Sequence, residues 1–180
     1  GQLAVRMFDF EGADAAARTL RRLLEDHPLA ALIEAESALV RRDVEAASAI
    51  LEPLLDQYPQ HPEALALAIA AAELANQEQL SAHLERRLRA SGPGDPRPFT
   101  TIGRLLSLHR QFEQSDRWLA MALELQPSWA AAHIEQGLMR WQAGQDSRAM
   151  ASMTRAVELD PFNLRAANSL ALLRSLEQYE

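Results

Sequence analysis

Prolines recur in this chain at a fixed interval of 34 residues, and this interval constrains the fold more than any other feature of the sequence. When 34-residue repeats are counted from Pro28, seven of the nine prolines fall at only two positions. Position 1 holds Pro28, Pro62 and Pro96, and position 32 holds Pro59, Pro93, Pro127 and Pro161. Internal periods of about 20 to 50 residues are typical of proteins built from stacked units. We therefore expect an array of repeats rather than one globular core.

Other positions of the repeat favour paired helices. A proline at position 1 suits the first turn of a helix, where the N–H group has no helical partner, and a proline at position 32 ends a helix. Mostly small residues at positions 8 and 20 would let two antiparallel helices approach closely, and position 27 can reach the next repeat. These columns hold Ala35, Ile69, Gly103, Gly137 and Ala171; Ala13, Ala47, Ser81, Ser115 and Ala149; and Leu20, Leu54, Leu88, Ala122 and Ala156. One helix pair is too thin to bury both of its faces, so neighbouring repeats must stack.

The period and its columns resemble the tetratricopeptide repeat (TPR), whose pattern runs W-x2-L-G-x2-Y, then A-x3-F, then P. The repeat from Pro96 matches best, with Phe99, Ile102, Gly103, Leu106, Ser115, Leu119, Ala122 and Pro127. The repeat from Ala130 departs from the pattern at three positions that are usually bulky and apolar, namely His133, Gln136 and Arg140. The resemblance implies an all-α fold, a right-handed α-α superhelix of about eleven antiparallel-paired helices.

The repeat register predicts a single solenoid over residues 1–180. A partial repeat, 1–27, precedes four full repeats, 28–61, 62–95, 96–129 and 130–163, and a closing helix, 164–180. Natural solenoids usually carry polar caps, but the closing helix is rich in leucine, with Leu170, Leu172, Leu173 and Leu176. We therefore expect this chain to be part of a longer protein. The 18 basic residues are all arginine, which favours a GC-rich bacterial source.

The composition argues against several classes of function. The formal net charge is −7, and the scattered arginines form no clustered basic face of the kind that binds nucleic acid. No apolar run approaches the roughly 20 residues of a membrane span. The sequence lacks cysteine, an HExxH motif, a Gly-rich phosphate loop and a nucleophile elbow, and His27 and His61 share position 34 of successive repeats rather than a ligand spacing. We expect no enzymatic activity, cofactor, metal or nucleic-acid partner.

The resemblance also implies a binding groove. In proteins with this repeat, the first helices of successive repeats line a concave groove, which positions 2, 5, 9, 12 and 13 face. The candidate groove residues in the later half of this chain are Arg97, Thr100, Arg104, Ile134, Leu138, Trp141, Arg165 and Asn168. Such a surface suits a peptide or partner segment with an acidic group and an apolar anchor. The alternative is that the arginines are merely solvated and that Trp141 packs between helices.

The leading hypothesis is therefore a protein–protein interaction scaffold, and two alternatives stay open. The stretch 157–170 is similar to the last repeat before the metallopeptidase-like domain of some bacterial repeat proteins (peptidase MA-like). On that reading the chain is a non-catalytic helical arm of a larger enzyme. The other alternative is homo-oligomerisation through the uncapped ends. No targeting signal is visible, which leaves the compartment open and favours the cytoplasm only slightly.

Three local features have structural interpretations. The segment Ser91–Pro98 is rich in turn residues and is either a hinge or a tight connection. We favour the tight connection, because the 34-residue period continues through the segment. Trp118, on a second helix, is expected to cover the neighbouring helix while its indole N–H faces solvent. Trp129, at position 34, is expected to pack in the turn between repeats.

Overall fold

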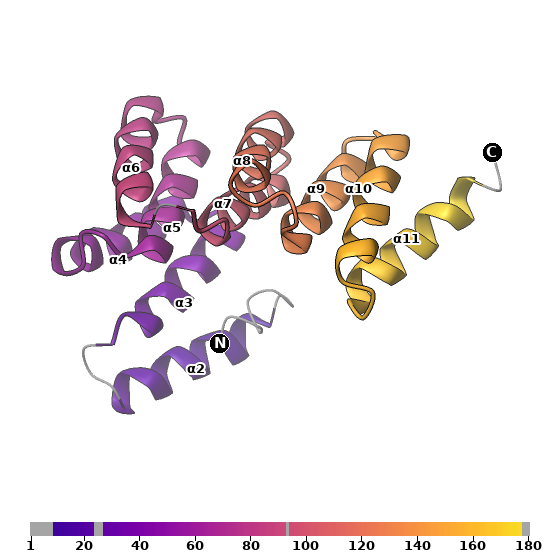
Figure 1. The fold of residues 1–180 in the computed structure, drawn as a ribbon. Coiled ribbons are helices and arrows are strands. Elements are labelled where there is room, and N and C mark those ends of the chain that lie inside the picture. The colour runs from indigo at the N-terminus through magenta and orange to yellow at the C-terminus, as the bar shows by residue number, and fades with distance from the viewer. Residues whose placement is uncertain (1–8, 24–26, 93, 178–180) are drawn as a thin grey trace. The chain divides into compact units, whose positions relative to one another are not determined.

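Every regular element in the described part of the chain is an α-helix. The structure is a computed structural model that describes residues 9–23, 27–92 and 94–177. Its helices are α2 (Phe10–Leu23), α3 (Pro28–Val40), α4 (Val44–Gln57), α5 (Pro62–Leu74), α6 (Glu78–Ser91), α7 (Arg97–Leu108), α8 (Phe112–Leu125), α9 (Ala130–Gln142), α10 (Asp146–Leu159) and α11 (Leu164–Glu177) (Figure 1). No strand occurs in these ranges, which confirms the predicted all-α class. Residues 1–8, at the start of the predicted partial repeat, lie outside the described residues.

The helix bounds follow the 34-residue register closely. The second helices of the repeats, α2, α4, α6, α8 and α10, all begin at position 17 and end at position 30. The first helices α3, α5, α9 and α11 begin at position 1, and α7 begins one residue later, with Pro96 as its N-cap. The proline columns therefore mark the start and the end of helices as predicted.

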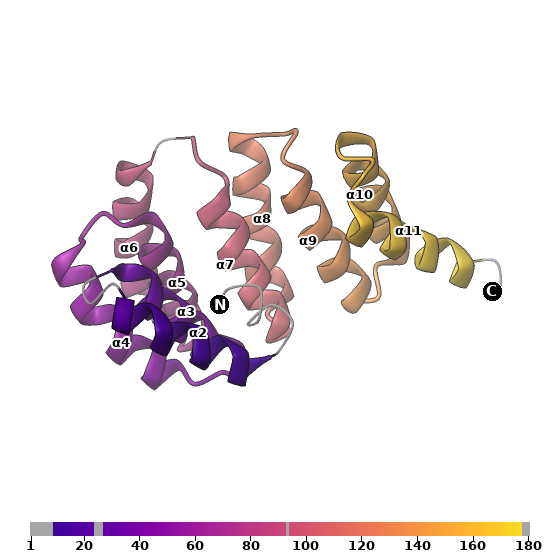
Figure 2. The ribbon, with the colours of Figure 1, turned by 90° about the horizontal axis from the view of Figure 1, so that it is seen from below.

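The helices form two compact units, Gly1–Pro93 (unit 1) and Gly94–Glu180 (unit 2). Unit 1 contains α2–α6 and unit 2 contains α7–α11. Within each unit, helices that are neighbours in the sequence pack together, and the first helices of consecutive repeats also meet, α3 with α5 and α7 with α9. Figure 2 shows α7, α8, α9 and α10 of unit 2 as a row of antiparallel helices. The boundary between the units falls in the turn-rich segment Ser91–Pro98.

Small residues bring the two helices of a repeat into contact. Ser115 of α8 is fully buried, and its hydroxyl donates a hydrogen bond to the carbonyl of Gly103 in α7 at 2.7 Å. A Cβ atom added to Gly103 would lie only 2.6 Å from Cγ of Leu119. In the next pair, a Cβ on Gly137 would lie 2.9 Å from Cγ of Met153. The close approach predicted at position 8 is confirmed for both pairs, and at position 20 it is confirmed for Ser115.

The turn inside each repeat depends on a left-handed residue at position 15. The residues there are Arg42 (φ 62°), Asn76 (φ 56°), Arg110 (φ 62°) and Gly144 (φ 72°). Each turn closes with two backbone hydrogen bonds, such as Arg110 N–H to the Ser107 carbonyl at 3.0 Å and Gln111 N–H to the Leu106 carbonyl at 3.1 Å. This is the Schellman arrangement, which satisfies carbonyls at the end of the first helix. Glycine is the usual residue at the left-handed position of this motif, but among these four turns only the one at Gly144 has it.

Position 34 supplies a side-chain acceptor at the start of the next first helix in four of five cases, the exception being Trp129 before α9. The side chains of His27, His61, Asp95 and Asn163 accept hydrogen bonds from backbone N–H groups of Leu29, Ala64, Arg97 and Ala166 at 3.2, 3.4, 3.0 and 3.2 Å. Helix N-termini leave N–H groups without helical partners, and a side-chain acceptor satisfies one of them. The shared position of His27 and His61 therefore has a structural cause.

The expectation for Trp118 was wrong, because its indole ring is fully buried. Trp118 lies three residues after Ser115 and four before Ala122, on the face of α8 that meets α7. Its ring centroid is 6.1 Å from that of Phe99, and the Arg117 guanidinium lies 5.2 Å from the indole. The indole nitrogen finds no hydrogen-bond acceptor among the described residues.

We predict that Gly103→Ala lowers the stability of the protein. The added methyl must displace Leu119, and overpacking of this kind costs about 1–3 kcal/mol. The better helix propensity of alanine offsets at most about 1 kcal/mol of that cost. Gly92→Ala is the control, since a Cβ there meets nothing within 4 Å. Urea unfolding followed by circular dichroism should show a lower midpoint for Gly103→Ala only, and equal midpoints would contradict the role of position 8.

Candidate partner-binding face

The eight candidate groove residues all lie in unit 2, on its three first helices. Arg97, Thr100 and Arg104 belong to α7, Ile134, Leu138 and Trp141 to α9, and Arg165 and Asn168 to α11. The structure divides them into buried residues, half-buried residues, ion-paired residues and an exposed residue. Their sequence positions alone did not distinguish these groups.

Thr100 and Arg104 are both buried. The Thr100 hydroxyl donates a hydrogen bond to the Pro96 carbonyl at 2.9 Å and accepts one from the indole N–H of Trp129 at 3.1 Å. Trp129 therefore ties the turn before α9 back to α7. These contacts occupy the Thr100 hydroxyl within the fold, so its main role in this structure is to join two repeats.

The three candidates on α9 belong to an apolar cluster. Ile134 is buried in the core that α9, α10 and α11 share, together with Met153, Leu170 and Leu173. Leu138 and Trp141 are half-buried and pack against the same core. Trp141 thus has the inter-helix packing of the alternative interpretation, while part of its side chain stays accessible.

Two of the arginines are already paired with acids. The Arg97 guanidinium contacts both carboxylate oxygens of Asp95 at 2.9–3.2 Å, and this hydrogen bond holds the pKa of Asp95 below its ordinary value. Arg165 on α11 donates to the two oxygens of Glu135 on α9 at 2.6 and 3.3 Å. The Glu135 side chain is only 11% exposed. An acidic group of a ligand would have to compete with these carboxylates, so the face is less cationic than its residues suggested.

One side of α11 is exposed and carries four residues in helical register. Arg165, Asn168, Leu172 and Leu176 follow the spacing i, i+3, i+7 and i+11, and we call them the α11 face. Leu172 and Leu176 are 46% and 48% exposed. The opposite side of the helix packs into the core through Ala166, Leu170 and Leu173. The α11 face therefore presents two leucines beside an amide and a paired guanidinium.

Two of the three residues that depart from the TPR pattern, Gln136 and Arg140, form a closed hydrogen-bonded ring with Asp116 and Ser152, which we call the polar ring. Gln136 donates to Asp116 at 3.1 Å and accepts from the hydroxyl of Ser152 at 3.2 Å. Arg140 donates to the same Asp116 oxygen at 3.3 Å and to Ser152 at 2.9 Å. The ring joins α8, α9 and α10. Because each side chain finds partners, these half-buried polar groups can replace the usual apolar contacts.

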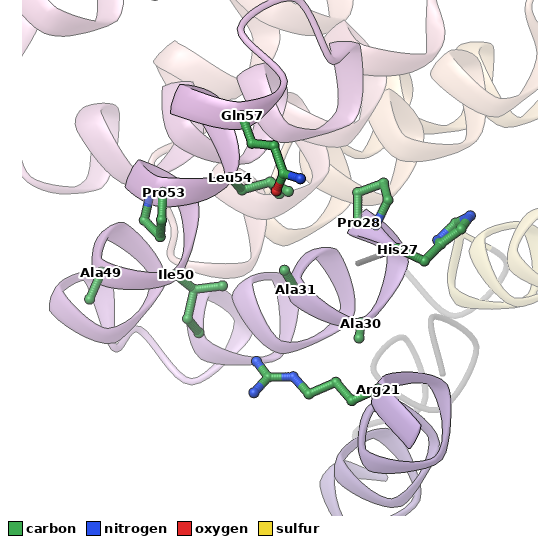
Figure 3. Close-up of a pocket in the computed structure, with 10 residues that line it drawn as sticks. All are labelled: Arg21, His27, Pro28, Ala30, Ala31, Ala49, Ile50, Pro53, Leu54 and Gln57. Carbon is green, nitrogen blue, oxygen red and sulfur yellow. The ribbon is translucent and has the colours of Figure 1, made fainter. Parts of the chain in front are cut away.

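A pocket of about 490 Å³ lies in unit 1 between α2, α3 and α4 (Figure 3). Its walls are mainly apolar, with Ala30 and Ala31 from α3 and Ile50 and Pro53 from α4. The Arg21 side chain extends along it from α2 (Figure 3) and is ion-paired with Glu34. None of the eight candidate groove residues lines this pocket.

Two further classes of site are absent from the part of the chain that the structure describes. No three His, Asp or Glu side chains there come together as metal ligands. Within the same ranges, no helix combines the length and the apolar character of a membrane-spanning segment.

The structure is similar to solved TPR proteins. A thermophilic TPR protein of Thermus thermophilus is 16% identical and aligns with a TM-score of 0.65 over 96% of this chain and 95% of that chain. PilF of Pseudomonas aeruginosa is 20% identical, with a TM-score of 0.54 over 93% of this chain and 72% of that chain. YrrB, described as a TPR protein with an unusual peptide-binding site, is 16% identical, with a TM-score of 0.50 over 93% and 86% of the two chains.

These similarities confirm the TPR fold that the 34-residue period predicts. At such low identities they establish the fold alone. No family model matches the sequence, and no curated protein matches it.

We predict that Asp116→Ala destabilises unit 2 by about 1–2 kcal/mol, because it removes the acceptor that Gln136 and Arg140 share. The double substitution Asp116→Ala, Arg140→Met should cost less than the two single substitutions together, since each single substitution leaves the other charged group without its partner. Urea unfolding of the two single variants and the double variant measures the coupling energy between the two sites. Strictly additive effects would show that the ring contributes nothing as a unit.

Proposed function

We propose that this chain is a protein–protein interaction scaffold that holds a peptide or partner segment against the first helices of unit 2. The observation that supports this most directly is the α11 face, with its two accessible leucines. Of the seven large apolar side chains that are exposed in the described residues, four lie between positions 162 and 176 of the chain. Clustered apolar exposure in a folded protein is typical of an interaction surface.

The ligand chemistry follows from the neighbours of these leucines. Leu172 and Leu176 are on α11, and the half-buried Leu138 and Trp141 lie on α9, which packs beside it. The Asn168 amide can both donate to and accept from a peptide backbone. Because Arg165 is paired with Glu135, we expect the ligand to be anchored by apolar side chains rather than by an acidic group. A peptide ligand agrees with the peptide-binding site described for YrrB.

Self-association is the second candidate function, and the same face supports it. The exposed Leu172 and Leu176 could be covered by the same leucines of a second copy of the chain, just as they could be covered by a partner peptide. The helical arm of a larger enzyme stays a hypothesis that rests on the sequence resemblance in residues 157–170. The two binding hypotheses differ in a measurable way, because only self-association raises the mass of the isolated chain with concentration.

We predict that Leu172→Asp, Leu176→Asp weakens ligand binding by at least about tenfold, since burying an introduced carboxylate against an apolar anchor is costly. A peptide selected on the wild-type chain from a displayed random library serves as the probe, and fluorescence polarisation gives its Kd. Leu125→Asp is the matched control, because Leu125 is exposed in the same unit but lies at the end of α8.

Equal Kd values for the two variants would refute the assignment of the α11 face. Light scattering over a concentration series separates the two candidates: a dimer that Leu172→Asp, Leu176→Asp abolishes supports self-association, whereas a constant monomer mass excludes it.

A further inference from the structure

A second pocket in unit 1 has a different character from the α11 face. It has a volume of about 270 Å³ and lies between α4, α5 and α6. It is lined by alanines of α5, including Ala68 and Ala72, and by leucines of α4 and α6, including Leu51 and Leu84. We call this pocket the inter-repeat slot. Alanine and leucine side chains make up most of its lining, and the polar residues of the lining include Glu52 and Asp56.

The repeat register explains why the slot is open. Ala68 and Ala72 occupy positions 7 and 11 of their repeat, where the repeat from Ala130 has Gln136 and Arg140. The slot residues Ser48 and Leu84 occupy positions 21 and 23, where unit 2 has Asp116 and Ser152. These four positions in unit 2 are the members of the polar ring. The slot is therefore the space that a glutamine and an arginine side chain fill in unit 2 and that two alanines leave empty in unit 1.

The mouth of the slot is acidic. Glu52 and Asp56 line it from α4, one helical turn apart, and both are exposed. Within the described residues, neither takes part in an ion pair. Arg87 lies on the α6 side, where its guanidinium donates to the Pro59 carbonyl at 2.7 Å. Two unpaired carboxylates thus stand beside an apolar cavity in a chain whose net charge is −7.

We propose that the inter-repeat slot binds an arginine or lysine side chain, flanked by an apolar residue, from a helix or peptide of a partner protein. The aliphatic stem packs against Leu51, Leu84 and the alanines, as long basic side chains do when their stems are buried and their charges are not. The charged head meets Glu52 and Asp56 in charge-assisted hydrogen bonds. Unit 2 contains the intramolecular counterpart, since Arg140 fills the equivalent space and reaches the carboxylate of Asp116.

The slot and the α11 face are separate sites. The slot belongs to unit 1 and selects a cation, whereas the α11 face belongs to unit 2 and selects apolar side chains. The proposal for the slot therefore stands or fails independently of the proposed function of unit 2. The two carboxylates of the lining outweigh the single positive charge of Arg87 and would attract a basic segment, an effect that weakens as salt increases.

The test uses a defined probe, a fluorescein-labelled alanine-based helical peptide with one leucine and one arginine a helical turn apart. Its control is the same peptide with glutamate in place of arginine. Binding is followed by NMR of the isotope-labelled chain, with peptide added up to about 1 mM. We expect saturable shifts of the backbone amides of Ala68, Ala72 and Leu84 with the arginine peptide and none with the glutamate peptide.

Two variants test the location. In the plugged variant, Ser48→Asp, Ala68→Gln, Ala72→Arg, Leu84→Ser, the four residues of the polar ring are copied into unit 1, and peptide binding should be lost. In the second, Glu52→Arg, Asp56→Arg, only exposed residues change, so the fold is preserved, and binding should weaken by about tenfold or more. Glu113→Arg, Glu124→Arg is its control, because it makes the same change of net charge on exposed residues of α8.

The proposal would be overturned by the absence of saturable shifts at the slot, by equal shifts with both peptides, or by wild-type affinity in Glu52→Arg, Asp56→Arg. If the plugged variant does not fold, the affinity of Glu52→Arg, Asp56→Arg by itself tests where the peptide binds. Equal loss of binding in Glu113→Arg, Glu124→Arg and in Glu52→Arg, Asp56→Arg would also overturn the proposal, because the loss would then follow from the change of net charge alone.

Discussion

The fold of this chain depends on the close approach of two helices within each repeat. At Gly103 and Gly137 the helices lie so near each other that a Cβ atom would overlap a side chain of the partner helix. Ser115 adds a buried hydrogen bond across one of these contacts. The distance between the two helices of a repeat then determines which of the remaining positions lie next to each other. Positions 7 and 11 of a first helix then face positions 21 and 23 of the second helices around it, in unit 1 and unit 2 alike.

The helices could be predicted from the sequence because their signals are backbone constraints. Proline lacks the N–H group that a helix interior uses, so the prolines at positions 1 and 32 mark the helix bounds closely, although Pro53 lies inside α4. The turns were harder to predict, because Arg42 and Arg110 adopt a left-handed conformation that arginine itself does not indicate. The burial of Trp118 was missed because it depends on which face of α8 meets α7, and its indole suggested a position near solvent.

The candidate site was predicted only in outline. The groove positions were taken to be alike in every repeat, but Thr100, Arg104 and Ile134 proved to be buried and Asn168 exposed. The acids that neutralise the predicted arginines lie 2 and 30 residues away in the chain, so the sequence does not mark them as partners. In consequence, unit 2 offers apolar contacts on α11, while in unit 1 the carboxylates of Glu52 and Asp56 line the inter-repeat slot without an ion pair.

The polar ring has a consequence for the evolution of the array. A perfect 34-residue register suggests modules that recombination can duplicate, delete or exchange freely. Loss of residues 96–129 would preserve that register but would replace Asp116 with Ala82 at position 21 of the preceding repeat. Arg140 would then have lost its carboxylate partner, and Gln136 its acceptor. Deleting or exchanging one of the repeats 96–129 and 130–163 without the other would therefore break the polar ring, so the two repeats constrain each other.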